Sequence, residues 1–177
     1  MRIAPVAFLD DFSNSEIRDL CRITHHNDEA YIGARCVVIA IRAILNGNWT
    51  GETNLIDLII DKIPDTRVRD RLIEIKRIEH LSKIGDLGNN GYVVDSVPLA
   101  IAAANKIKDT GIENMFLQLI EIGGDTDTNC SIAGQIAGTL IGRKGIPENL
   151  LQKLSKLNEY NWIQTTITNL TKNQNWV

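Results

Sequence analysis

Apolar residues recur at the three- and four-residue spacing of amphipathic helices along nearly the whole chain. Ser13 followed by Glu16 is a capping-box pattern, which predicts a short helix that continues through Leu20. Asn27 is expected to cap a second, longer helix that ends at Gly47. The core positions of this helix are Ala30, Ala34, Val37, Val38, Ile41, Ile44 and Leu45.

The middle of the chain continues the helical pattern. A third helix is expected over about residues 54–63, and a fourth over residues 68–85. The polar, glycine-rich segment 85–91 follows as a loop. Asp95 is expected to cap the next helix, with Pro98 in its first turn, where a missing N–H is tolerated.

Glycines and a proline divide the last third of the chain. The Gly-Gly pair at 123–124 is expected to end a helix over residues 112–120, and a Gly- and Ala-rich helix over 132–141 follows. Pro147 opens a short helix, and the tail from Asn158 is expected to form a last amphipathic helix. The residues expected to pack as aromatic anchors are Trp49, Trp162 and Trp176.

No stretch shows the sustained alternation typical of a strand, so the sequence predicts an all-α protein. We expect a compact multi-helix bundle that forms one domain over residues 1–177. Hydrophobic residues make up 44% and charged residues 23% of the chain, as in ordinary globular domains. The net charge of -3 and the lack of a Lys/Arg block argue against a nucleic-acid partner.

Composition also bears on location. The three cysteines are scattered and form no metal or disulfide pattern, which favours a reducing compartment. The N-terminal apolar run is too short for a signal peptide, and no segment reaches the roughly 18 apolar residues of a membrane helix. These features predict a cytoplasmic protein without a membrane partner.

Candidate chemistry is concentrated in the segment GGDTDTNCSIAGQIAG, residues 123–138. The two glycines permit a tight turn, after which Asp125 and Asp127 alternate with threonines. In a turn-like backbone, positions two apart point the same way, so both carboxylates can face one point beside the Thr128 hydroxyl. Such hard oxygen ligands suit Mg²⁺, Mn²⁺ or Ca²⁺ better than zinc.

A simpler interpretation is that these side chains only cap the helix that follows, because Asp and Thr are common N-cap residues. The helix itself favours the metal interpretation. Its glycines at 134, 138 and 142 each cost roughly 1 kcal/mol of helix propensity, which predicts a neighbouring helix that passes very close. Such packing is expected to seat Asp125 and Asp127 deep in the bundle, where acids need a cation or hydrogen bonds.

Several motifs, in their order along the chain, resemble the ADP-ribosylglycohydrolase family. The segment Gly-Gly-Asp-Thr-Asp-Thr-Asn at 123–129, before a Gly/Ala-rich helix and Ile146-Pro147, is similar to the family's C-terminal signature. The other matching segments are Met1–Pro5, Thr24-His25 with Asp28 and Ala30, and Gly91–Pro98. The resemblance covers nearly the whole chain.

The resemblance implies an all-α hydrolase that binds a pair of Mg²⁺ or Mn²⁺ ions and cleaves the glycosidic bond between ADP-ribose and an acceptor side chain. ADP-ribose or an ADP-ribosylated protein would be its partner. The metal ligands would be Asp125, Asp127 and Thr128. The residues against the ADP-ribose would be His25, Gly91, Tyr92, Met1 and Arg2.

The family's N-terminal third, with its Thr-Asp-Asp ligands and an acid near the reacting centre, has no counterpart in this sequence. Only half of the two-metal site is therefore expected, and no catalytic acid or base is identified. Three interpretations follow: a split enzyme completed by a separate chain, a truncated inactive relative, or a complete protein with a binding or structural role. We expect a hydrolase that is incomplete on its own, and the alternative is a catalytically inactive helical protein.

Overall fold

The prediction of an all-helical protein is confirmed. The computed structural model describes residues 1–171, with side chains described through residue 169, and this part contains helices and no strand. The α-helices are α1 Asn14–Arg22, α2 Asp28–Leu45, α3 Leu55–Ile60, α4 Arg67–Ile75, α5 Leu81–Gly85, α6 Val93–Asn105, α7 Ile107–Ile122, α8 Thr126–Ile141, α9 Glu148–Ser155 and α10 Tyr160–Thr171. Two short 3₁₀ helices, Ala4–Phe8 and Arg143–Gly145, complete the elements.

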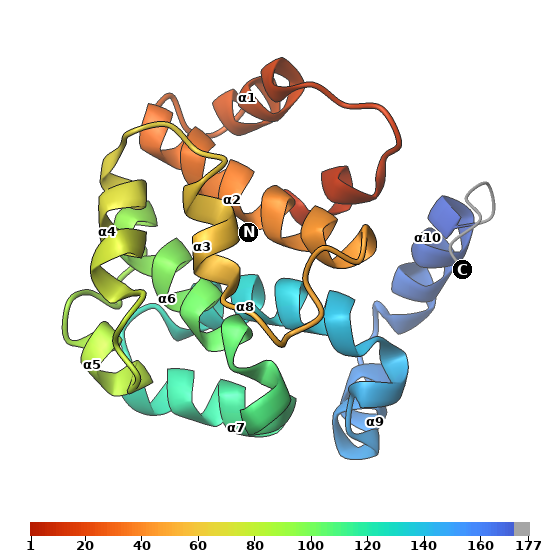
Figure 1. Ribbon diagram of the computed structural model, residues 1–177. Coiled ribbons are helices and arrows are strands. Elements are labelled where there is room, and N and C mark those ends of the chain that lie inside the picture. The colour runs from red at the N-terminus through yellow and green to blue at the C-terminus, as the bar shows by residue number, and fades with distance from the viewer. Residues whose placement is uncertain (172–177) are drawn as a thin grey trace. The chain divides into compact units, whose positions relative to one another are not determined.

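The chain divides into two compact units, Met1–Gly142 and Arg143–Val177. In the first unit, α6 is the central helix and packs against α2, α4 and α8. Its residues are buried almost without interruption from Val94 to Ala104, as expected for a helix that is covered on all sides. Figure 1 shows α2 and α8 lying beside it, with α7 below. That one domain spans residues 1–177 stays a prediction.

Helix starts gather at one end of the first unit. The Glu29 carboxylate, in the first turn of α2, accepts hydrogen bonds from the Arg67 and Val68 backbone N–H groups at the start of α4, over 3.0 and 3.1 Å. Gly33 of α2 lies against Val93, the first residue of α6. In Figure 1, α2, α6 and α8 all begin on the left of the bundle. The positive ends of these helix dipoles therefore point to the same region.

Helices α2 and α6 pack closely at Gly33. A Cβ atom at this position would overlap the Val93 side chain and lie 3.3 Å from Val97 Cγ2. The prediction of close packing along the α8 glycines is wrong for Gly138, where a Cβ would meet no atom within 4 Å. Gly142 likewise meets nothing and ends the helix with φ +59. At Gly134 the expectation holds, because a Cβ there would lie only 3.1 Å from the Phe116 ring of α7. Of the three α8 glycines, only Gly134 therefore marks a close helix–helix contact.

Two expected helix boundaries also differ. The helix expected over 68–85 is broken into α4 and α5, and backbone carbonyl groups in the break accept hydrogen bonds from side chains of other segments. The Lys76 carbonyl accepts from Asn54 over 3.5 Å, and the Glu79 carbonyl accepts from Lys106. Helix α6 begins earlier than expected, at Val93. Asp95 therefore lies in the first turn instead of capping it, and Pro98 lies inside the helix.

The second unit, described through residue 171, contains α9 and α10. No residue of α9 is buried, although its apolar residues lie along one face. Trp162 in α10 is 71% exposed, so its expected role as a packing residue is wrong, whereas Trp49 in the first unit is buried as expected. Trp176 lies outside the described residues. Within residues 1–171 no helix combines the length and apolarity needed to cross a bilayer.

Two glycine variants test this packing. Gly33→Ala should lower the free energy of unfolding by about 1–3 kcal/mol, since the new methyl group overlaps a β-branched side chain that cannot swing away. Gly138→Ala should raise it by about 0.5–1 kcal/mol, because the helix gains propensity without a clash. Urea denaturation of both variants measures the two changes. Equal effects would contradict the assignment of the close contact to Gly33.

Candidate functional site

The acidic segment forms a tight turn between α7 and α8. Gly123 and Gly124 have φ values of +78 and +72, a conformation that side chains disfavour, and they reverse the chain after α7. Asp125 then takes the N-cap position of α8, and Asp127 and Thr128 lie in its first turn. We refer to residues 123–128 as the acid turn.

The two acidic side chains of the acid turn influence each other. The side-chain hydrogen bond with Asp125 is the main reason that the pKa of Asp127 lies below its usual range, and the Thr128 backbone N–H lowers this pKa further. Asp127 is thus a carboxylate that stays ionised at neutral pH. Asp125 occupies the N-cap position but makes no capping hydrogen bond. Capping alone therefore does not account for the Asp125 side chain.

A second segment, the glycine loop of residues 88–92, packs against the acid turn. A Cβ atom on Gly91 would overlap Asp125 Oδ2, so only glycine allows this carboxylate its position. The Asn89 carbonyl oxygen accepts hydrogen bonds from the Asp125 backbone N–H over 2.9 Å and from Asn129 Nδ2 over 3.0 Å. The structure therefore brings two of the expected site segments, Gly91-Tyr92 and Asp125–Thr128, into direct contact.

Tyr92 connects the glycine loop to the start of α4. Its hydroxyl oxygen accepts a hydrogen bond from Arg67 Nη1 over 3.0 Å, and the guanidinium carbon lies 5.5 Å from the ring centroid. The sequence did not single out Arg67, because it lies in a run of mixed charges that resembles a solvated helix face. Only the fold places this cation beside Tyr92.

The remaining expected ligand contacts form a separate group. Arg2 Nη2 donates to Thr24 Oγ1 over 3.0 Å, and His25 Nδ1 lies 2.8 Å from the same oxygen. Met1 and His25 are both exposed. Among the described residues, no hydrogen bond or ion pair joins this group to the acid turn. The placement of Met1, Arg2 and His25 against ADP-ribose therefore stays a prediction.

The acid turn is not seated as deeply as expected. Asp127 is exposed and Asp125 and Thr128 are half-buried, so the expectation of a deep site is wrong for Asp127. The physical reason is the side of α8 that is covered. The buried face carries Asn129 and the apolar residues that follow it, and the exposed Asp127 lies off that face.

The donor set of the acid turn fits a hard divalent cation in part. Two converging carboxylates and a hydroxyl are ligands of the correct chemical type for Mg²⁺ or Mn²⁺. Such ions take about six oxygen ligands. The three side chains supply fewer when each binds through one oxygen atom. In residues 1–171, no group of three or more His, Cys, Asp or Glu side chains is placed to hold a metal ion. The acid turn is therefore a partial site at most.

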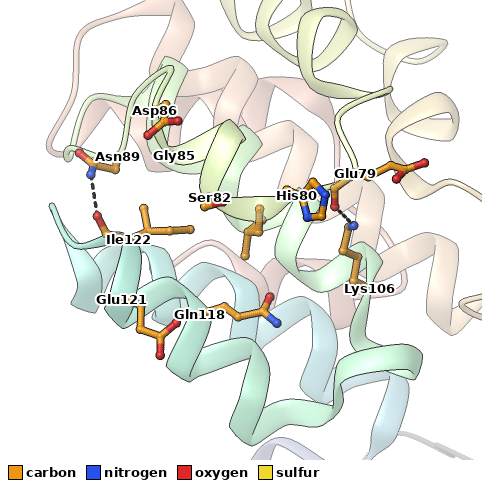
Figure 2. A pocket seen from close by; sticks show the side chains of 11 residues that line it. Glu79, His80, Ser82, Gly85, Asp86, Asn89, Lys106, Gln118, Glu121 and Ile122 are labelled. Atoms are coloured by element: carbon orange, nitrogen blue, oxygen red, sulfur yellow. Dashed lines mark hydrogen bonds between the residues drawn. The ribbon is translucent and has the colours of Figure 1, made fainter.

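A groove of about 730 Å³ lies between α5 and α7. Figure 2 shows its polar lining, which includes Glu79, His80, Lys106 and Glu121. Asn89 forms one edge of the groove and donates from Nδ2 to the Ile122 carbonyl over 3.1 Å. Neither Asp125 nor Asp127 lines it. The groove adjoins the acid turn through Asn89.

Comparison with known proteins agrees with these motifs. The profile of the ADP-ribosylglycohydrolase family matches residues 1–176. The chain is 26% identical to ADP-ribosylhydrolase ARH3 of Gallus gallus, over 90% of this chain and 53% of that protein. It is 26% identical to ADP-ribosylarginine hydrolase Tri1 of Pseudomonas putida, over 88% of this chain and 41% of that protein. The chain thus spans about half the length of these curated relatives. It belongs to the ADP-ribosylglycohydrolase family.

Proposed function

We propose that this chain is the part of an ADP-ribosyl hydrolase that carries one side of its Mg²⁺ or Mn²⁺ site. The observation that supports this proposal most is the close contact of the Asp125 carboxyl group with Gly91, together with the influence of Asp125 on Asp127. Two segments far apart in the sequence are thereby combined around one pair of carboxylates. The reaction is hydrolysis of the glycosidic bond between ADP-ribose and an acceptor side chain, and the name of Tri1 suggests arginine as one acceptor.

The side chains of the site have separate roles in this proposal. Asp125, Asp127 and Thr128 hold the metal, which when bound orients the ribose hydroxyl groups and polarises a water molecule. Tyr92 lies against the ADP-ribose. Arg67 and the nearby helix N-termini place positive potential beside Tyr92, which suits the pyrophosphate anion.

The rest of the site comes from outside these residues in this proposal. The matched regions make up only 53% and 41% of the two relatives, and the acid turn offers too few ligands for a hard cation. We therefore propose that the missing ligands belong to the part of the family fold that these matches leave out. That part is supplied either by a longer form of this chain or by a separate chain. The residues described here bind the metal weakly by themselves.

A second candidate function is a catalytically inactive helical protein that keeps the fold for binding or assembly. The exposure of Asp127 and the lack of a third acidic ligand in residues 1–171 favour it. The two candidates differ in metal binding. A binding or structural role does not require Asp127 to hold a cation, whereas the hydrolase role does.

The substitution Asp127→Asn tests the metal role directly. It should reduce Mn²⁺ binding at least tenfold, because one of two converging carboxylates loses its charge. Isothermal titration calorimetry of the purified chain with MnCl₂ measures the change. Asp109→Asn is the matched control, since Asp109 also lies in the first turn of a helix, is exposed, and is remote in sequence from the acid turn.

Two outcomes would decide against the hydrolase. Equal Mn²⁺ affinity in the Asp127 and Asp109 variants would mean that the acid turn does not hold the cation. Absence of any Mn²⁺ or ADP-ribose binding by the unmodified chain would leave the inactive helical protein as the better candidate. Release of ADP-ribose from an ADP-ribosylated protein, dependent on Mg²⁺ and on Asp127, would exclude that candidate.

Gly91→Ala tests whether the glycine loop and the acid turn form one site. The added methyl group overlaps Asp125 Oδ2 and must displace that carboxylate, so Mn²⁺ affinity should fall roughly tenfold. Gly91 is exposed, and the melting temperature should therefore change little. Unchanged Mn²⁺ affinity, measured beside Gly138→Ala as the control, would show that Asp125 does not depend on the loop.

A further inference from the structure

Asn129 is a polar residue on the buried face of α8. Its side chain is fully buried, and its neighbours on the same face are apolar. The amide nitrogen Nδ2 donates to the Asn89 carbonyl oxygen over 3.0 Å. The amide oxygen Oδ1 has no hydrogen-bond donor among the described residues. A buried acceptor without a donor destabilises the fold, and proteins often retain such unsatisfied groups at functional sites.

The acceptor that Asn129 uses is shared with the acid turn. The Asp125 backbone N–H donates to the same Asn89 oxygen over 2.9 Å. Asn89 is in turn fixed by its own side chain, which donates to the Ile122 carbonyl at the end of α7 over 3.1 Å. Gly124 contacts this carbonyl so closely that a Cβ there would overlap it. One backbone carbonyl therefore joins the glycine loop to the acid turn.

We propose that Asn129 is the positioning residue of this site. Its side chain holds the Asn89 carbonyl against the start of α8, and the Asp125 carboxylate thereby stays between Gly91 and Asp127. The role is indirect, because Asn129 acts through Asn89 and has no part in contacting the cation. The effect of Asn129 on metal binding rests on the proposed function. The loop-to-turn coupling itself is independent of that function.

The substitution Asn129→Leu separates positioning from folding. Leucine is similar in size and removes both the donor and the unpaired acceptor, so the melting temperature should be unchanged or higher. The Asp125 amide should exchange its hydrogen at least tenfold faster, because the carbonyl that accepts it is no longer held. Mn²⁺ affinity should fall by a similar factor. Hydrogen exchange followed by NMR on the metal-free chain gives the main result.

Gln135→Leu is the matched control. Gln135 lies on the same helix and donates to the Ser131 carbonyl over 2.9 Å, a bond within α8 that joins no second element. It should leave the Asp125 amide exchange and Mn²⁺ affinity unchanged. If Asn129→Leu fails to fold, Asn129→Ala gives the same comparison.

The two proposals fail in different ways. Unchanged exchange of the Asp125 amide in the Asn129 variant would overturn the positioning role, as would equal acceleration of all α8 amides. Faster exchange at Asp125 in a chain that binds no Mn²⁺ would support the positioning role and contradict the proposed metal site instead.

Discussion

The hydrogen bonds to the Asn89 carbonyl oxygen hold the candidate site together. This oxygen accepts from the Asp125 backbone N–H and from the buried Asn129 side chain, and it leaves no room for a side chain on Gly124. Through it, the loop before α6 and the turn before α8 become one unit. The contact of Asp125 with Gly91 depends on this oxygen, because the two residues lie in the two segments that it joins.

The helix packing explains why this unit lies where it does. Close contact of α2 with α6 at Gly33 brings their starts to one end of the first unit, and Glu29 and Arg67 bring the start of α4 to the same end. Acidic residues lie at these helix starts, where the positive end of each helix dipole stabilises a carboxylate. Asp127 of the acid turn is exposed, and the turn offers fewer oxygen ligands than a hard cation takes. Both features are consistent with a chain that spans about half the length of its relatives.

Local signals in the sequence predicted the elements that depend on local interactions. The Ser13 capping box, the Asn27 cap and the Gly-Gly turn at 123–124 each use hydrogen bonds or backbone angles within a few residues, and all are present. The break between α4 and α5, the contact at Gly33 and the position of Arg67 depend on partners far along the chain. The prediction of close packing along the α8 glycines failed at Gly138 for the same reason, since helix propensity does not specify which neighbour a helix meets.

The central claim is that Asp125 and Asp127 share one cation. Crystals of the chain soaked in MnCl₂, with anomalous diffraction data collected near the manganese absorption edge, test it most directly. The account predicts an anomalous peak within about 2.0–2.4 Å of oxygens from both carboxylates. No peak at the acid turn, or a peak only in the groove between α5 and α7, would contradict it.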